Sequence, residues 1–159
     1  ASVKKIKVFY SQIEKVEDAY VLDTGSPHYV TFRKGVKDLD VKSAGAAIRN
    51  HPKFSEEGIN VNFVEEKAEG HLFMRTYERG VEAETLSCGT GVTAAAISYL
   101  HFHGKQGKQK VAVSTPGGTL SVSTHVGDGL CFNVELIGPA VMVFKGSFDL
   151  GYFSSGGNT

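Results

Sequence analysis

The chain has 159 residues, 41% of them hydrophobic, with 17 basic and 17 acidic side chains that give a formal net charge of zero. This length suits one domain and can bury roughly 70% of its unfolded surface without a disulfide. The balanced charge argues against nucleic acid as a partner, no apolar run approaches the ~20 residues of a membrane span, and two cysteines without a signal peptide favour the cytoplasm.

In chain order, short alternating or β-rich runs separated by turn residues predict a sheet of about eight strands. The dense turn signals at 24–27 and 116–118 separate neighbouring runs. The runs lie at 5–10, 19–23, 28–32, 59–64, 71–77, 111–114, 120–123, 130–136 and 140–146.

Two segments predict helices. Asp40 is a plausible N-cap for a surface helix through 41–48, where apolar residues recur at helical spacing. Residues 90–102 are apolar all round, which is typical of a buried helix, and Gly104 is the expected stop. We therefore predict one α+β domain over residues 1–159, in which the sheet wraps around a central buried helix.

Cys88 stands just before this central helix and is followed by Gly89, Thr90 and Gly91. The first turn of a helix presents free N–H groups and a partial positive charge, so it can receive an anion and stabilise a thiolate. Taken alone, Cys88 would more simply be a small buried hydrophobe at a tight turn. The glycines at a helix start favour a functional interpretation, because they let a ligand approach the backbone.

Other polar residues also have two interpretations. Glu78 and Arg79 end the strand before Cys88 and could point into the same site, or they could form a solvent-exposed ion pair. Asn60 and Asn62 lie on the polar face of an apolar strand, where they could bind a ligand or satisfy a loop. His28 follows a turn and could titrate near neutral pH or be a half-buried structural histidine.

Several chemistries lack the residues they need. Cys131 lies within an apolar strand and is predicted to belong to the core. No histidine–cysteine cluster has metal-ligand spacing, so no metal is expected. The glycines form neither a GxGxxG nor a Walker pattern, so no nucleotide site is indicated.

Together, four ordered motifs over nearly the whole chain resemble diaminopimelate epimerase. The cysteine motif Thr85-Leu86-Ser87-Cys88-Gly89-Thr90-Gly91, preceded by Tyr77-Glu78-Arg79-Gly80, resembles the second cysteine motif of that family. The turn 23–28 resembles its Gly-Asn-Pro-His turn. Two further groups of segments resemble blocks of the family. One consists of 50–54 and 60–63, and the other of 116–118, 138–140 and 144–146.

The resemblance implies a cofactor-free epimerase that converts LL- to meso-diaminopimelate for lysine and peptidoglycan precursors. Inverting a carbon requires a proton to leave one face and another to arrive on the opposite face, so two acid/base groups must flank it. In this family both groups are cysteines, and Cys88 matches the second. The family is built as two similar halves, each a β-barrel around a central helix, with the site between them.

The resemblance also implies residue roles. Gly89 and Thr90 would bind the α-carboxylate of the diaminopimelate substrate, and Asn60, Glu78 and Arg79 would bind its other charged groups. His28 and Glu78 would tune the protonation of the thiol at Cys88.

Two departures concern this substrate site. Ser26 stands where the family usually has an asparagine, which puts one ligand to the distal end of the substrate in doubt. The loop from Glu78 to Cys88 looks one residue longer than is typical.

The first cysteine of the family belongs to a preceding half that residues 1–24 do not supply, and the chain starts at Ala1. We therefore expect this chain to be the C-terminal half of a longer enzyme, inactive alone, with the missing N-terminal half as its partner. A second copy of the chain, as a homodimer, is a further candidate partner.

Four alternatives to this function can be considered, and two of them are disfavoured. A proline racemase or hydroxyproline epimerase shares the two-cysteine logic and a similar fold, whereas a phenazine-type isomerase would lack the thiol at position 88. A non-catalytic domain could keep only the anion site. A cysteine hydrolase is disfavoured because no histidine is clearly placed to act as the base for the thiol. Spacing alone does not exclude His28 from that role.

Overall fold

The computed structural model describes residues 6–147. In this range the chain forms ten strands, two α-helices and two 3-10 helices. The elements are β1 (Ile6–Phe9), η1 (Tyr10–Gln12), β2 (Glu14–Val16), β3 (Ala19–Asp23), β4 (Pro27–Phe32), η2 (Val36–Asp38), α1 (Val41–Arg49), β5 (Asn60–Ala68), β6 (His71–Glu78), β7 (Ala83–Thr85), α2 (Gly89–Phe102), β8 (Gly107–Thr115), β9 (Gly118–Gly127) and β10 (Leu130–Ile137).

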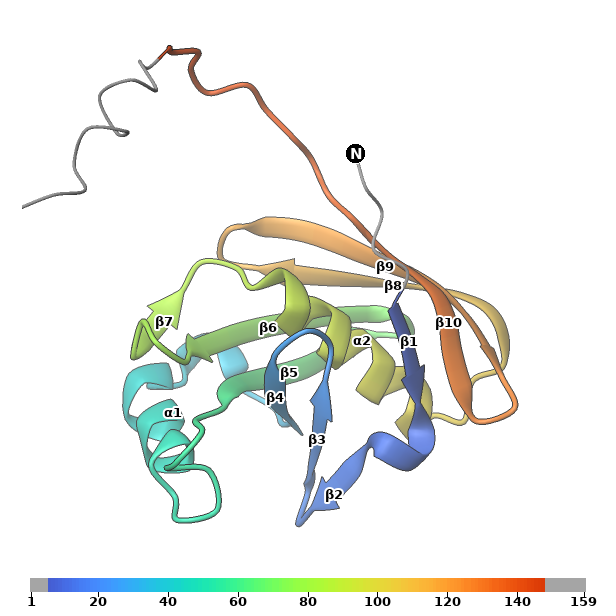
Figure 1. Cartoon of the computed structure of the whole chain (residues 1–159), viewed down its shortest axis with the longest axis horizontal. Helices are drawn as coiled ribbons and strands as arrows, with labels where there is room; N and C mark the ends of the chain where they lie inside the picture. The colour runs from blue at the N-terminus through green and yellow to red at the C-terminus, as the bar shows by residue number, and fades with distance from the viewer. Residues whose placement is uncertain (1–5, 148–159) are drawn as a thin grey trace, which may run out of the picture.

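All ten strands belong to one mixed sheet with the order β1-β10-β9-β8-β6-β5-β4-β3-β2, and β7 pairs with β6. Most neighbours are antiparallel, but β4 with β5 and β6 with β8 are parallel. Parallel neighbours require a crossover connection, and the two α-helices lie in these two connections. Figure 1 shows the result: the sheet curls around α2, and α1 lies outside it.

Helix α2 forms the centre of the domain. Every residue from Gly91 to Leu100 is buried, as the apolar sequence predicts, and the helix contacts side chains from both halves of the sheet. Phe102, at its C-terminal end, is 62% exposed. Gly104 follows with a φ of +59°, a left-handed conformation suited to a helix stop. The predicted buried helix and the predicted surface helix are both confirmed.

Strand β5 is buried on both faces, because it lies between the two helices. Val61 and Phe63 pack in the cluster that includes α1, whereas Val64 packs in the cluster around α2. Asn60 and Asn62 share the face of Val64, since alternate residues of a strand point the same way. The polar face that the sequence predicts is therefore an inner face: both asparagines are buried, and Asn62 lies against Gly91 of α2.

The predicted strand at 140–146 is wrong. These residues make no strand, and Val141, Met142, Val143 and Phe144 are 80–86% exposed. Figure 1 shows this segment leaving the domain after β10. Its composition favours a strand, but no edge within residues 6–147 pairs with it. The sequence also missed β2 and β7, which have only three residues each. Within the described range, no helix has the length and apolar character needed to cross a membrane.

We predict that Gly45→Ala destabilises the domain. Helix α1 lies so close to β6 that a Cβ on Gly45 would overlap the Tyr77 side chain. Overpacking typically costs 1–3 kcal/mol, which the higher helix propensity of alanine only partly offsets. Urea unfolding should show a loss of about 1–2 kcal/mol in the free energy of unfolding. Gly146→Ala, where a Cβ meets nothing within 4 Å, is the matched control. Equal stability of both variants would contradict the close approach.

Candidate functional site

Cys88 is the N-cap residue of α2 and is half-buried. Its backbone is extended, and its carbonyl oxygen accepts the hydrogen bond from the Val92 N–H at 2.8 Å. Its side chain caps no backbone N–H, so the sulfur remains available to other groups. The next three residues form the first helical turn, whose N–H groups have no partner within the helix. A thiol and a set of free amides therefore occupy the same end of α2.

The hydroxyl of Thr90 links Cys88 to the sheet. Its Oγ1 lies 3.5 Å from the Cys88 sulfur and 2.9 Å from Nε2 of His28. The backbone carbonyl of Thr90 accepts a hydrogen bond of 2.8 Å from the hydroxyl of Thr24, which is buried. The turn between β3 and β4 is thus fixed to the N-terminal end of α2.

His28 is fully buried on β4. Its Nε2 faces Thr90, with the Ser26 hydroxyl at 3.5 Å, and its Nδ1 lies 3.0 Å from Nδ2 of Asn62. Burial lowers the pKa of His28 to about 4; nearby Arg79 acts in the same direction, and Asp23 opposes it. The ring is therefore neutral near pH 7, in contrast to a histidine that titrates near neutrality.

Asn60 is occupied by structural contacts. Its Nδ2 donates to the Ser26 hydroxyl at 2.6 Å and to the Pro27 carbonyl at 3.1 Å, and its Oδ1 accepts from the Arg79 N–H at 2.9 Å. Both amide hydrogens are used, so only the second lone pair of Oδ1 remains for a ligand. Asn60 and Ser26 thus hold the β3–β4 turn against the end of β6.

Glu78 and Arg79 do not pair with each other. A carboxylate oxygen of Glu78 accepts from the Thr85 hydroxyl at 2.9 Å, and Nη1 of Arg79 donates to the Glu57 carbonyl at 2.9 Å. Among residues 6–147, no carboxylate forms an ion pair with Arg79. Its guanidinium group therefore keeps positive charge that a neighbouring anion could use.

The structure brings one set of predicted residues into direct hydrogen-bond contact: Cys88, Thr90, His28, Ser26 and Asn60. Glu78 and Arg79 join this set only through the end of β6, where the Arg79 N–H meets Asn60. Gly89 begins α2 directly after Cys88. The sequence assigned no site role to Thr24, Thr76 or Thr85, which the structure adds. The sequence singled out Asn62 by its alternation with Asn60 and by the matching block 60–63, but gave no sign of its bond to His28.

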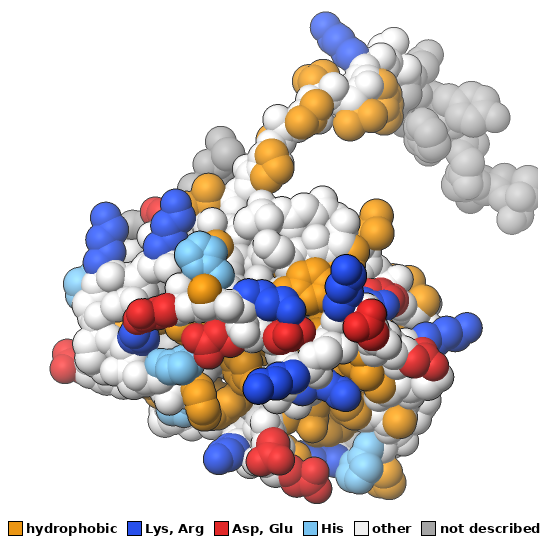
Figure 2. All heavy atoms as spheres, turned by 180° about the vertical axis from the view of Figure 1, so that it is seen from behind, with side chains coloured by type: hydrophobic (Ala, Val, Ile, Leu, Met, Phe, Trp, Pro, Cys, Tyr) orange, Lys and Arg blue, Asp and Glu red, His pale blue; other side chains and the backbone are white. Residues whose placement is uncertain are grey.

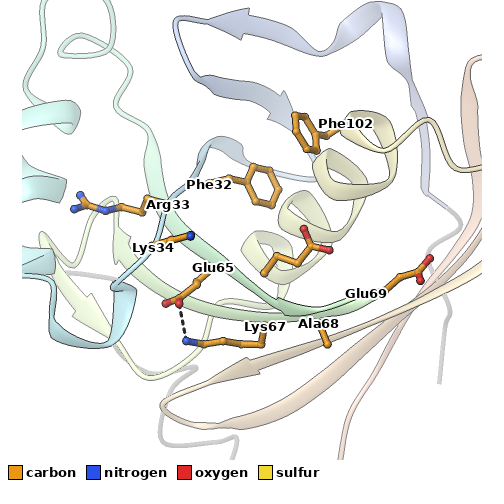
Figure 3. A pocket seen from close by; sticks show the side chains of 9 residues that line it. Phe32, Arg33, Lys34, Glu65, Lys67, Ala68, Glu69 and Phe102 are labelled. Atoms are coloured by element: carbon orange, nitrogen blue, oxygen red, sulfur yellow. Dashed lines mark ion pairs between the residues drawn. The ribbon is translucent and has the colours of Figure 1, made fainter.

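Two hollows lie near the ends of α2. One of about 190 Å³ is lined by Ser87, by 117–120 and by Pro139, and lies beside the cysteine turn. A larger one of about 380 Å³ lies at the other end, where Phe32 and Phe102 stack with centroids 6.1 Å apart. Its wall includes the Glu65–Lys67 ion pair shown in Figure 3. None of Cys88, Thr90 and His28 lines this larger hollow.

Neither the charges on the face shown in Figure 2 nor the metal-binding side chains of residues 6–147 indicate a second site. Acidic and basic side chains are interspersed on the face shown in Figure 2. Within residues 6–147, no three His, Cys, Asp or Glu side chains are grouped so that they could hold a metal ion.

Solved structures share the fold of this chain. A structure from Pseudomonas aeruginosa, described as a predicted epimerase, matches with a TM-score of 0.52 at 14% identity and covers 67% of this chain and 36% of its own. A hydroxyproline epimerase from Agrobacterium vitis matches with a TM-score of 0.51 at 15% identity, covering 81% and 42%. At these identities the likeness shows the fold alone.

Sequence comparisons identify the family. The sequence model of diaminopimelate epimerase matches residues 20–143. Diaminopimelate epimerase from Flavobacterium psychrophilum is 40% identical over 151 residues, which are 91% of this chain and 59% of that protein. The one from Aquifex aeolicus is 43% identical over 129 residues, 79% and 44% of the two chains. The chain belongs to the diaminopimelate epimerase family, and spans about half the length of these curated relatives.

We predict that burial of neutral His28 makes the domain sensitive to acid. Its pKa is about 4 when folded against 6.5 when exposed, so the unfolded chain binds the proton first as the pH falls. The free energy of unfolding is therefore highest above pH 6.5 and falls as the pH drops towards 4. Urea unfolding should give a free energy about 2 kcal/mol lower at pH 5 than at pH 7. His28→Gln, which has no titrating ring, should have a shallower slope, and equal slopes would refute the assignment.

Proposed function

We propose that this chain carries one catalytic half of a diaminopimelate epimerase and supplies one of its two acid/base cysteines. The observation that carries the proposal is the thiol of Cys88 at the N-terminus of α2, joined through Thr90 to His28, in a chain of this family. The substrate is LL-diaminopimelate and the product meso-diaminopimelate, for lysine and peptidoglycan precursors in the cytoplasm.

The reaction moves two protons across one carbon. One cysteine, as thiolate, takes the α-proton from one face, and the other, as thiol, gives a proton to the opposite face. The carbanion that forms between these steps places negative charge on the α-carboxylate. The free N–H groups of Gly89 and Thr90 at the start of α2, together with the partial positive charge there, would stabilise this charge. This chemistry needs no organic cofactor or metal.

Other side chains take binding and supporting roles. The guanidinium of Arg79 and the carboxylate of Glu78 are suited to the charged groups of the amino-acid substrate, because one supplies positive and the other negative charge. The contact of Thr85 with Glu78 holds that carboxylate in place. Neutral His28 supports the thiol through Thr90. Asn60 and Ser26 act chiefly by holding the turn that carries His28, and only Oδ1 of Asn60 keeps a lone pair for substrate.

The partner that completes the site would be the upstream half, with the other cysteine. The exposed apolar run at 141–144 supports this, because four consecutive exposed hydrophobic residues are typical of a surface that another chain segment covers. Figure 2 shows these side chains standing clear of the domain. Residues 1–159 would act as one domain of the complete enzyme, and a homodimer of that enzyme would be compatible with this arrangement.

A proline or hydroxyproline epimerase is the second candidate. Its support is the fold of the Agrobacterium vitis enzyme, which does not specify the substrate at 15% identity. The family match over residues 20–143 favours diaminopimelate.

The central test is α-proton exchange in heavy water, using the full-length protein that contains this chain and LL-diaminopimelate. We predict that Cys88→Ala slows deuterium incorporation by about 10²–10⁴-fold, the usual contribution of a general acid or base. Cys131→Ala, which removes the buried core thiol, is the matched control and should remain near the wild-type rate. Exchange at the wild-type rate in Cys88→Ala would refute the role, and exchange only with proline derivatives would favour the second candidate.

We further predict that residues 1–159 alone fold but do not turn over LL-diaminopimelate, because a single thiol cannot flank both faces of the carbon. Circular dichroism and cooperative urea unfolding would establish the fold, and chiral chromatography would follow the product. Adding the upstream half should restore turnover. Turnover by this chain alone, at the rate of the complete protein, would contradict the two-half arrangement.

A further inference from the structure

Asn62 is buried near the start of β5 yet has no role in the reaction proposed above. It is fully buried, on the strand face that α2 covers. Helix α2 comes so close that a Cβ on Gly91 would lie 2.5 Å from Oδ1 of Asn62. Its amide contacts the ring of His28 and does not reach Cys88 directly.

Its neighbours fix the orientation of this amide. The backbone carbonyl of Tyr29 lies 3.2 Å from Nδ2 and can only accept a hydrogen bond, so the NH₂ group must face it. On the other side, Oδ1 accepts from the Thr76 hydroxyl at 3.0 Å. The second hydrogen of Nδ2 then points to Nδ1 of His28, at 3.0 Å.

This contact determines which nitrogen of His28 carries the proton. Because Nδ1 accepts from Asn62, it carries no hydrogen, and the single proton of the neutral ring is on Nε2. That N–H faces Oγ1 of Thr90 at 2.9 Å and donates to it. The hydroxyl hydrogen of Thr90 is then free to point to the Cys88 sulfur, 3.5 Å away.

We propose that Asn62 is a positioning residue: by holding His28 as the Nε2–H tautomer, it makes the Thr90 hydroxyl a hydrogen-bond donor to the Cys88 sulfur. Donation to the sulfur runs in one direction, from Asn62 through His28 and Thr90, because the Tyr29 carbonyl alone already orients the amide of Asn62. A donor at the sulfur stabilises the thiolate over the thiol. The inference rests on the proposed function only in giving this thiolate a catalytic use.

Burial keeps the arrangement in place. His28 and Asn62 are both inaccessible to water, so no solvent molecule can substitute for a lost donor. The charged side chains that act on His28 are Asp23 and Arg79, whose effects oppose each other. The ring stays neutral near pH 7, which the Nε2–H tautomer requires.

The first test needs no substitution. ¹⁵N NMR of the histidine rings in the chain, with His28 assigned by His28→Gln, should give Nε2 protonated and Nδ1 unprotonated at pH 7. Asn62→Asp offers Nδ1 only an acceptor, so Nδ1 should gain a proton. Thr76→Val is the matched control: it removes a buried hydroxyl of the same network but leaves the Tyr29 contact that orients the amide. A wild-type ring protonated on Nδ1, or an unchanged ring in Asn62→Asp, would overturn the proposal.

The second test follows the sulfur by measuring the rate at which iodoacetamide alkylates Cys88, by mass spectrometry at a fixed pH of 7. Thr90→Val should slow alkylation by about 10-fold, because hydrogen bonds to charged groups are among the stronger ones. Thr90→Ser should restore the rate, and Thr76→Val should leave it unchanged. A rate in Thr90→Val equal to wild type would sink the link to the sulfur.

Both tests omit substrate, so they fail or succeed separately from the proposed epimerase activity. If the predicted tautomer is found but the full-length protein shows no α-proton exchange, the proposed function is refuted and the positioning role is kept. If α-proton exchange is found but the ring is the opposite tautomer, the positioning role is refuted and the proposed function is kept.

Discussion

The rest of the domain depends on one constraint, which is that α2 is apolar on every side. Such a helix is stable in water only when it is surrounded, so a flat sheet that covers one face would leave the others exposed. The ten-stranded sheet meets this need by curling, and the two parallel crossovers place one helix inside the curl and the other outside. With the body of α2 sealed, its polar N-terminus is one of the few parts of it that a ligand could reach.

Enclosing α2 has a cost where the surrounding sheet becomes polar. The inner face of β5 carries Asn60 and Asn62, and a buried amide without partners costs about 1–3 kcal/mol. The structure offsets this by giving every amide hydrogen and each Oδ1 of the two asparagines a hydrogen-bond partner from neighbouring residues. The small size of Gly91 allows the helix to approach Asn62. A polar network that is fully bonded has one arrangement only, and it holds His28 beside Thr90.

The sequence predicts those parts that depend on local pattern. Periodicity identified the two helices, and the ordered motifs brought Cys88, Thr90 and His28 to one site. It failed where the partner is distant or outside the described residues: 140–146 has the composition of a strand but nothing in residues 6–147 to pair with. It also missed the bond of Asn62 to His28, which joins residues 34 positions apart. Nor could it show that the amide of Asn60, predicted to bind substrate, already donates to Ser26 and Pro27.

The pairing of the first strand with the last has a kinetic consequence. β1 lies between solvent and β10, with Val8 opposite Cys131, so these partners are more than 120 residues apart in the chain. Closing so long a loop loses chain entropy that neighbouring strands do not lose. The meander β8–β9–β10 can form from local contacts, whereas β1 can pair with β10 only after that meander has folded. The order of assembly is therefore opposite to the order of the sequence at this edge, and the earliest residues of the domain join it among the last.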